Sequence, residues 1–72
     1  MKHRTTKINV GIYIVTFENG AKVRVERYPD GLWNTFLVSK NEYAHDSYMQ
    51  TYCTKGDAIA ELIACAHELT DL

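Results

Sequence analysis

The chain has 72 residues and a formal net charge of −1, so it is long enough for one domain and lacks the basic excess typical of nucleic-acid-binding proteins. Its hydrophobic content of 46% and charged content of 24% are those of a folded domain and argue against disorder. No apolar run approaches the roughly 20 residues of a membrane span, and the basic start lacks the apolar segment of a signal peptide. We therefore expect one small domain over residues 1–72, with a solvated N-terminal end and no membrane contact.

The first structural signal is Asn19-Gly20, which lies between residues 8–18 and 21–28. Both flanks are rich in β-branched and aromatic residues, which favour strands. Asn and Gly tolerate the positive φ angles that a two-residue type I′ turn needs. The sequence therefore predicts a β-hairpin whose register is set by this turn.

Further strands are expected after a second turn at residues 28–31, where Pro, Asp and Gly follow one another. We predict a third strand over residues 32–38, a polar loop over 39–46 and a fourth strand over 47–53. The alternative is a second helix within residues 40–52, because residues 39–42 resemble a capping box.

The C-terminal part has the pattern of a helix. Thr54 is placed to be the N-cap, with Asp57 three residues later. The apolar residues that follow recur at helical spacing, at Ala58, Ile59, Leu62, Ile63, Ala66 and Leu69. The expected fold is α+β: an antiparallel β-meander of about four strands, with a C-terminal helix packed on one face.

The predicted hairpin register assigns side chains to the two faces of the sheet. With a two-residue turn, Thr16 faces Val23 and Ile14 faces Val25, and neighbours on a strand alternate. The expected core face, covered by the helix, carries Val10, Ile12, Ile14, Val23 and Val25. The other face carries Tyr13, Val15 and Phe17 opposite Glu26, Arg24 and Lys22, with Phe36, Val38, Tyr48 and Tyr52 as candidate extensions.

This second face is the candidate partner-binding surface, because a solvated face is normally polar on every strand. Exposed aromatic residues beside arginine have the composition of interface hot spots. The predicted contact residues are Tyr13, Phe17, Lys22, Arg24 and Glu26. Two alternatives are structural: the Lys22 and Arg24 stems shield the rings, or the N-terminal segment or a second helix covers them.

The residues with catalytic or metal-binding chemistry are scattered. His3, His45 and His67 lie far apart in the sequence, and Cys53 and Cys65 do not have zinc-site spacing. A helix between the cysteines separates them by roughly 16 Å, too far for a disulfide. Free thiols suit a reducing cytoplasm. We expect no catalytic residue, metal or cofactor, and hence no enzyme.

Single-stranded nucleic acid is a rival partner, because aromatic and basic side chains on an open sheet are a known way to bind it. The near-neutral net charge, the acidic side of the helix and Glu26 on the same face argue against it. The second rival is a homo-oligomeric structural module that buries the same face against a second copy.

Residues 14–26, which read Ile-Val-Thr-Phe-Glu-Asn-Gly-Ala-Lys-Val-Arg-Val-Glu, resemble the first hairpin of a small family of phage-encoded type I-F anti-CRISPR proteins. The shared pattern is an aromatic residue, then Glu-Asn-Gly, a small residue and Lys, ending in Arg-Val-Glu. In that family an antiparallel sheet packs on helices and binds the Cas7-type backbone subunits of an RNA-guided surveillance complex, which blocks target DNA. A family tyrosine corresponds to Phe17, and a family glutamate corresponds to Glu26 if two residues between them are removed.

The resemblance implies a phage or mobile-element inhibitor that occupies the surface of a host nucleoprotein complex in the cytoplasm. From the residues alone the expectation is broader: a small non-enzymatic protein-binding module that acts through one sheet face. In such a contact the aromatic side chains would supply buried area, and the charges would set orientation and association rate.

Overall fold

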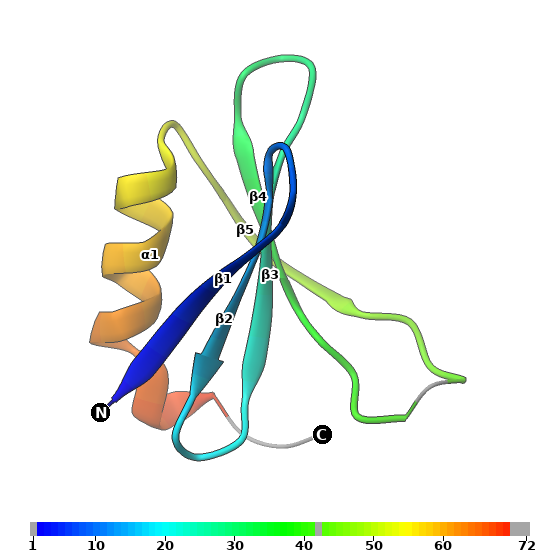
Figure 1. Ribbon diagram of the computed structural model, residues 1–72, viewed down its shortest axis with the longest axis vertical. Coiled ribbons are helices and arrows are strands. Elements are labelled where there is room, and N and C mark those ends of the chain that lie inside the picture. The colour runs from blue at the N-terminus through cyan, green and yellow to red at the C-terminus, as the bar shows by residue number, and fades with distance from the viewer. Residues whose placement is uncertain (1, 42, 70–72) are drawn as a thin grey trace.

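The computed structural model of the protein describes residues 2–41 and 43–69 and shows an α+β architecture. Five antiparallel strands follow one another in the sheet in chain order, and one α-helix lies beside them (Figure 1). The elements are β1 (His3–Asn9), β2 (Ile12–Phe17), β3 (Lys22–Arg27), β4 (Trp33–Leu37), β5 (Ser47–Tyr52), α1 (Lys55–Ala64) and the 3-10 helix η1 (Ala66–Glu68). The predicted class is confirmed, but the sheet has five strands rather than four.

The additional strand is β1, which sequence analysis treated as a solvated end and the start of the first strand. The chain reverses at Val10-Gly11, where Gly11 has a φ of 74° and the Val10 N–H donates to Asn9 Oδ1 at 2.8 Å. β1 then pairs with β2 from His3 to Asn9, with an irregularity in the register at Ile8. Every residue of β1 is exposed, so this strand lacks the alternation of buried and exposed side chains by which a strand is recognised in a sequence.

The hairpin at Asn19-Gly20 forms as predicted, but its register differs by one residue. Gly20 has a φ of 92° and Asn19 has no positive φ. The Phe17 N–H donates to the Ala21 carbonyl, and the Gly20 N–H donates to the Phe17 carbonyl, each at 2.9 Å. This is a three-residue loop over residues 18–20, a type I turn closed by a left-handed glycine, and not a type I′ turn.

The physical reason for this register is the Asn19 side chain. Its Oδ1 accepts the Ala21 N–H at 3.0 Å, and its Nδ2 donates to the carbonyls of Ala66 at 3.4 Å and Leu69 at 3.1 Å. Asparagine favours such local turn bonds. The wider loop places Val15 opposite Val23 and Tyr13 opposite Val25.

The register reverses the predicted faces of β2, because a slip of one residue turns every side chain over. Val15 and Phe17 are buried together with Val23 and Val25. Ile12 and Ile14, which were expected in the core, lie on the other side, opposite Glu26 and Arg24. The prediction was wrong for β2 and correct for β3.

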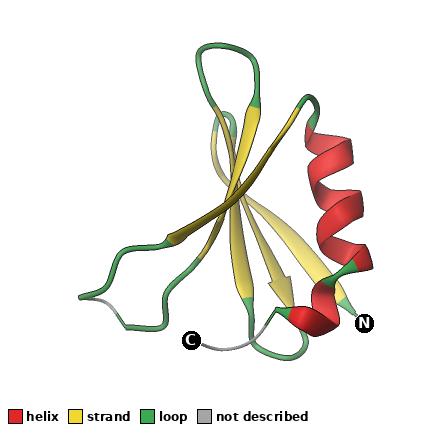
Figure 2. Cartoon of the chain, turned by 180° about the vertical axis from the view of Figure 1, so that it is seen from behind, coloured by secondary structure: helices red, strands yellow, loops and turns green. Residues whose placement is uncertain are grey.

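The core lies between the sheet and α1, which contacts β3, β4 and β5 (Figure 2). Thr54 is the N-cap, and its Oγ1 accepts the Asp57 N–H at 3.1 Å, which confirms the predicted helix start. Ala58 and Leu62 are buried, whereas Ile63, expected on the buried stripe, is 40% exposed. The buried apolar residues are Val15, Phe17, Ala21, Val23, Val25, Ala58, Leu62, Ala66 and Leu69.

The segment that was ambiguous in the sequence is a loop followed by β5, as favoured, and its described residues form no second helix. Glu42, part of the capping-box pattern, lies outside the described residues. β5 pairs with β4 across an irregularity beside Thr35. The buried Thr35 hydroxyl provides hydrogen-bond partners for the Gln50 backbone at this irregularity. It donates to the Gln50 carbonyl at 2.8 Å and accepts the Gln50 N–H at 3.1 Å.

Matched threonine substitutions at Val15 and Ile14 test the register, because both keep a β-branched side chain. Val15→Thr buries a hydroxyl in the core and should lower the free energy of unfolding by about 1–3 kcal/mol. Ile14→Thr changes a half-buried side chain outside the core and should cost below about 1 kcal/mol. Urea denaturation measures both; the reverse order would support the two-residue turn.

Alanine substitutions at two glycines test the loop geometry. Gly20→Ala forces a side chain into the left-handed region and should destabilise the protein by about 1–2 kcal/mol. Gly56→Ala in the first turn of α1 meets only the Thr54 hydroxyl at 3.9 Å, and it should stabilise by about 0.5–1 kcal/mol. Thermal melts of the two variants should therefore shift in opposite directions; equal shifts would contradict the loop assignment.

Candidate functional site

The candidate site is the sheet face that α1 does not cover, here called the uncovered face. Its residues alternate along the strands with the buried Val15, Val23, Val25 and Thr35, and they therefore point away from the helix. They are Arg4 and Thr6 on β1, Ile12, Ile14 and Thr16 on β2, Lys22, Arg24 and Glu26 on β3, Asn34 and Phe36 on β4, and Tyr48 and Thr51 on β5.

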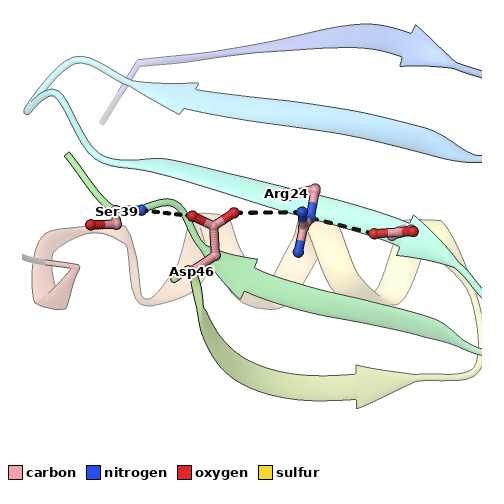
Figure 3. Close-up of polar contacts among 4 residues, drawn as sticks. Arg24, Ser39 and Asp46 are labelled. Carbon is pink, nitrogen blue, oxygen red and sulfur yellow. Dashed lines mark hydrogen bonds and ion pairs between the residues drawn. The ribbon is translucent and has the colours of Figure 1, made fainter. Parts of the chain in front are cut away.

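Arg24 lies at the centre of this face (Figure 3). Its guanidinium carbon is 4.5 Å from the centroid of the Phe36 ring, a cation–π geometry. Its Nε lies 3.4 Å from Glu26 Oε2, and its Nη1 lies 3.5 Å from Asp46 Oδ2. One arginine thus joins β3, β4 and the loop before β5.

Asp46 holds the loop between β4 and β5 against the sheet. Its Oδ1 accepts the Ser39 backbone N–H at 3.0 Å, while Oδ2 faces Arg24 (Figure 3). Within the loop, the Ser39 hydroxyl accepts the Asn41 N–H at 3.1 Å, and Asn41 Oδ1 accepts the Tyr43 N–H at 3.0 Å. Sequence reasoning placed Asp46 in a polar loop, and nothing in the local pattern marks it as the partner of an arginine on β3.

The aromatic part of the uncovered face is ordered by its own contacts. The Phe36 and Tyr48 rings pack edge to face, with centroids 5.8 Å apart. Thr51 Oγ1 donates to Asn34 Oδ1 at 2.6 Å, so the Tyr48 hydroxyl is the donor to Thr51 at 2.6 Å. Tyr48 is nevertheless 58% exposed, which leaves a fixed aromatic surface in contact with solvent.

The guanidinium of Arg24 is not fully satisfied. Its Nε is buried and has no hydrogen-bond partner among the described residues, although the Glu26 carboxylate lies close enough for an ion pair. About one third of the side chain is exposed. Arg24 is therefore held by charge and by the Phe36 ring, with hydrogen-bonding capacity left over.

The structure separates the five residues predicted to contact a partner. Lys22, Arg24 and Glu26 share the uncovered face, and the predicted extensions Phe36 and Tyr48 join them. Phe17 is only 2% exposed and belongs to the core. Tyr13 is half-buried on the helix side, where its ring lies 6.1 Å from that of Trp33. The faces predicted for Phe17 and Tyr13 were wrong because the three-residue loop shifts the register of β2 by one residue.

Two groups with altered acidity lie on the helix side of the molecule. Burial raises the pKa of the Cys65 thiol, and Glu61 and Glu68 raise it further. Burial also raises the pKa of the Tyr52 hydroxyl, with Glu61 as the next cause. Both groups are therefore protonated at neutral pH, and a protonated thiol is a poor nucleophile. Within the described ranges, no three His, Cys, Asp or Glu residues gather as metal ligands.

Comparison of the chain with family models, with curated proteins and with solved structures finds no match. The resemblance of residues 14–26 to the anti-CRISPR hairpin therefore stays a prediction. In the part of the chain that the structure describes, none of the helices has the length and apolar character that crossing a bilayer requires.

Removal of the Asp46 carboxylate tests its role in the loop. Asp46→Ala should lower the free energy of unfolding by no more than about 1 kcal/mol, because the ion pair is partly exposed. Hydrogen exchange at the Ser39 amide should accelerate clearly, since its acceptor is lost. Glu26→Gln is the control: it weakens the other ion pair of Arg24 and should leave Ser39 exchange unchanged. Unchanged exchange in Asp46→Ala would contradict the assignment.

Proposed function

We propose that this protein is a non-enzymatic binding module that docks a protein partner on its uncovered face. The observation that carries the proposal is the position of Arg24, stacked on Phe36 between two carboxylates on the face that α1 does not cover. Arginine and aromatic side chains are the residues that contribute most to binding free energy in protein interfaces.

The neighbours of Arg24 support a docking role over a merely solvated one. A sheet face that only meets water is normally polar on every strand. Here Ile12 and Ile14 on β2 share the face with Phe36 and Tyr48, and the β3 side chains Arg24 and Glu26 lie between them. The ring contact and the hydroxyl chain from Tyr48 to Asn34 fix the side chains before binding, which reduces the entropy lost when a partner docks.

The resemblance of the first hairpin to the anti-CRISPR family supports a particular class of partner. We infer an inhibitor encoded by a phage or mobile element, which acts in the cytoplasm and blocks a host nucleoprotein complex, with Cas7-type subunits as the candidate partner. Lys22, Arg24 and Glu26 would orient the contact and set its association rate. Arg24, Phe36 and Tyr48 would supply the buried area that the sequence had assigned to Tyr13 and Phe17.

The test is affinity capture from the host cell, followed by a binding measurement with the captured complex or with a purified type I-F surveillance complex. The Arg24→Ala/Tyr48→Ala double variant should lose at least about 10-fold in affinity, since hot-spot truncation typically costs more than 1 kcal/mol per residue. Addition of the wild-type protein should reduce target-DNA binding by the surveillance complex.

Tyr43→Ala is the matched control, because Tyr43 is a tyrosine that is 90% exposed and lies in the loop rather than on a strand of the sheet. It should bind like the wild type. Equal affinity of the double variant would contradict the proposal. Light scattering tests the alternative that the protein forms a homo-oligomer through the uncovered face. A mass that rises with concentration in the wild type but not in the double variant would show that this face binds a second copy of the chain.

A further inference from the structure

A second surface lies on the other side of the sheet, where the strands extend past the N-terminal end of α1. There the β1–β2 turn, the β3–β4 turn and the start of α1 come to the same end of the molecule (Figure 1). The two turns and the strands beside them border an open groove of about 650 Å³. It is lined by Lys7, Val10, Gly11, Tyr13, Arg27, Tyr28, Pro29 and Trp33.

The groove combines cations with aromatic rings. Lys7 and Arg27 lie among its lining residues and are exposed. Lys55, the first residue of α1, places its Nζ 4.2 Å from the centroid of the Tyr13 ring. In residues 2–41 and 43–69, none of these three cations forms an ion pair. Their positive charge is therefore available to an anion.

No carboxylate is among the lining residues, in contrast to the uncovered face. Asp30 follows Pro29 in the sequence but does not line the groove, and its Oδ1 accepts the Leu32 N–H at 2.9 Å within its own turn. The chain as a whole carries a net charge of −1. A groove lined by two cations in a protein of near-neutral net charge therefore attracts negative charge locally, over roughly one Debye length, about 8–10 Å.

The aromatic rings offer a flat surface beside that charge. Tyr13 already has Lys55 over one side and Trp33 at 6.1 Å. Tyr28 is 41% exposed, and Trp33 is half-buried, with part of its side chain packed against the core. Planar bases stack on such rings, and cations held beside them neutralise phosphates.

We propose that this groove binds a nucleotide unit, with its base against Tyr28 and Trp33 and its phosphate between Lys7 and Arg27. The backbone beneath is already fixed, because the Arg27 N–H donates to the Gly11 carbonyl at 2.8 Å. A β-carbon at Gly11 would make an ordinary contact with Arg27 Cβ at 3.5 Å, so Gly11 and Arg27 lie side by side in the groove. The site is independent of the uncovered face, which lies on the opposite side of the sheet.

Trp33 is the single tryptophan of the chain, so its fluorescence reports directly on the groove. The titrants are adenosine monophosphate, adenosine, inorganic phosphate and a single-stranded oligodeoxynucleotide of about eight nucleotides. We expect quenching with a dissociation constant on the order of 10⁻⁵ M at low salt, and, for the oligonucleotide, a log–log salt slope of about −0.7 for one neutralised phosphate on a single strand. Comparable affinity for the monophosphate identifies a free nucleotide as the ligand, whereas binding of the oligonucleotide alone identifies a strand.

The variants separate charge from stacking. Lys7→Gln/Arg27→Gln should weaken the bound titrant at least about 10-fold, and Tyr28→Ala should weaken it as well. Lys22→Gln, which removes a cation from the uncovered face, should have little effect. In the wild type, the amide resonances of Gly11, Tyr13 and Trp33 should shift with the same titrant, a readout that does not depend on any variant folding.

Three results would overturn the proposal: no quenching at about 1 mM of the monophosphate or the oligonucleotide, binding that is unchanged in Lys7→Gln/Arg27→Gln, or inorganic phosphate binding as tightly as the monophosphate. Because the variants of this test lie outside the uncovered face, except for the Lys22 control, failure here leaves the proposed protein contact untouched.

Discussion

The arrangement of the whole molecule depends on how the chain closes between Phe17 and Ala21. The Asn19 side chain accepts the Ala21 N–H while Gly20 takes a left-handed conformation, and this loop places Val15 and Phe17 against α1. The same side chain reaches the carbonyls of Ala66 and Leu69. One asparagine therefore sets the register of the hairpin and ties it to the C-terminal segment, so that sheet and helix are fixed relative to each other.

Two chemically different surfaces follow from this register. On the uncovered face, Arg24 is balanced by Glu26 and Asp46 beside apolar and aromatic side chains, a composition typical of protein interfaces. On the helix side, the strands are longer than the area that α1 covers, and Lys7 and Arg27 border exposed rings. Tyr13 belongs to this second surface only because β2 is turned over relative to a two-residue hairpin.

The sequence is sufficient to predict the α+β class, the capped helix, β5 and the facing of β3, because each rests on local chemistry. β1 could not be recognised, since all of its side chains are exposed. The register of the first hairpin also rests on local chemistry, the side-chain hydrogen bond of Asn19 followed by a left-handed glycine, and was therefore within reach of sequence analysis. The second turn closes in the same way: the Leu32 N–H donates to Asp30 Oδ1, and Gly31 has a φ of 84°. The pairing of Arg24 with Asp46 depends on the whole sheet, and no local signal indicates it.

The register can be measured most directly by cross-strand nuclear Overhauser effects between α-protons. Phe17 and Ala21 form a hydrogen-bonded position, and these positions alternate with close α-proton pairs along an antiparallel ladder. Ile14 and Arg24, which oppose each other, should therefore give a strong effect. A strong effect between Val15 and Arg24 in its place would show a two-residue turn, and it would contradict both the core and the two surfaces described above.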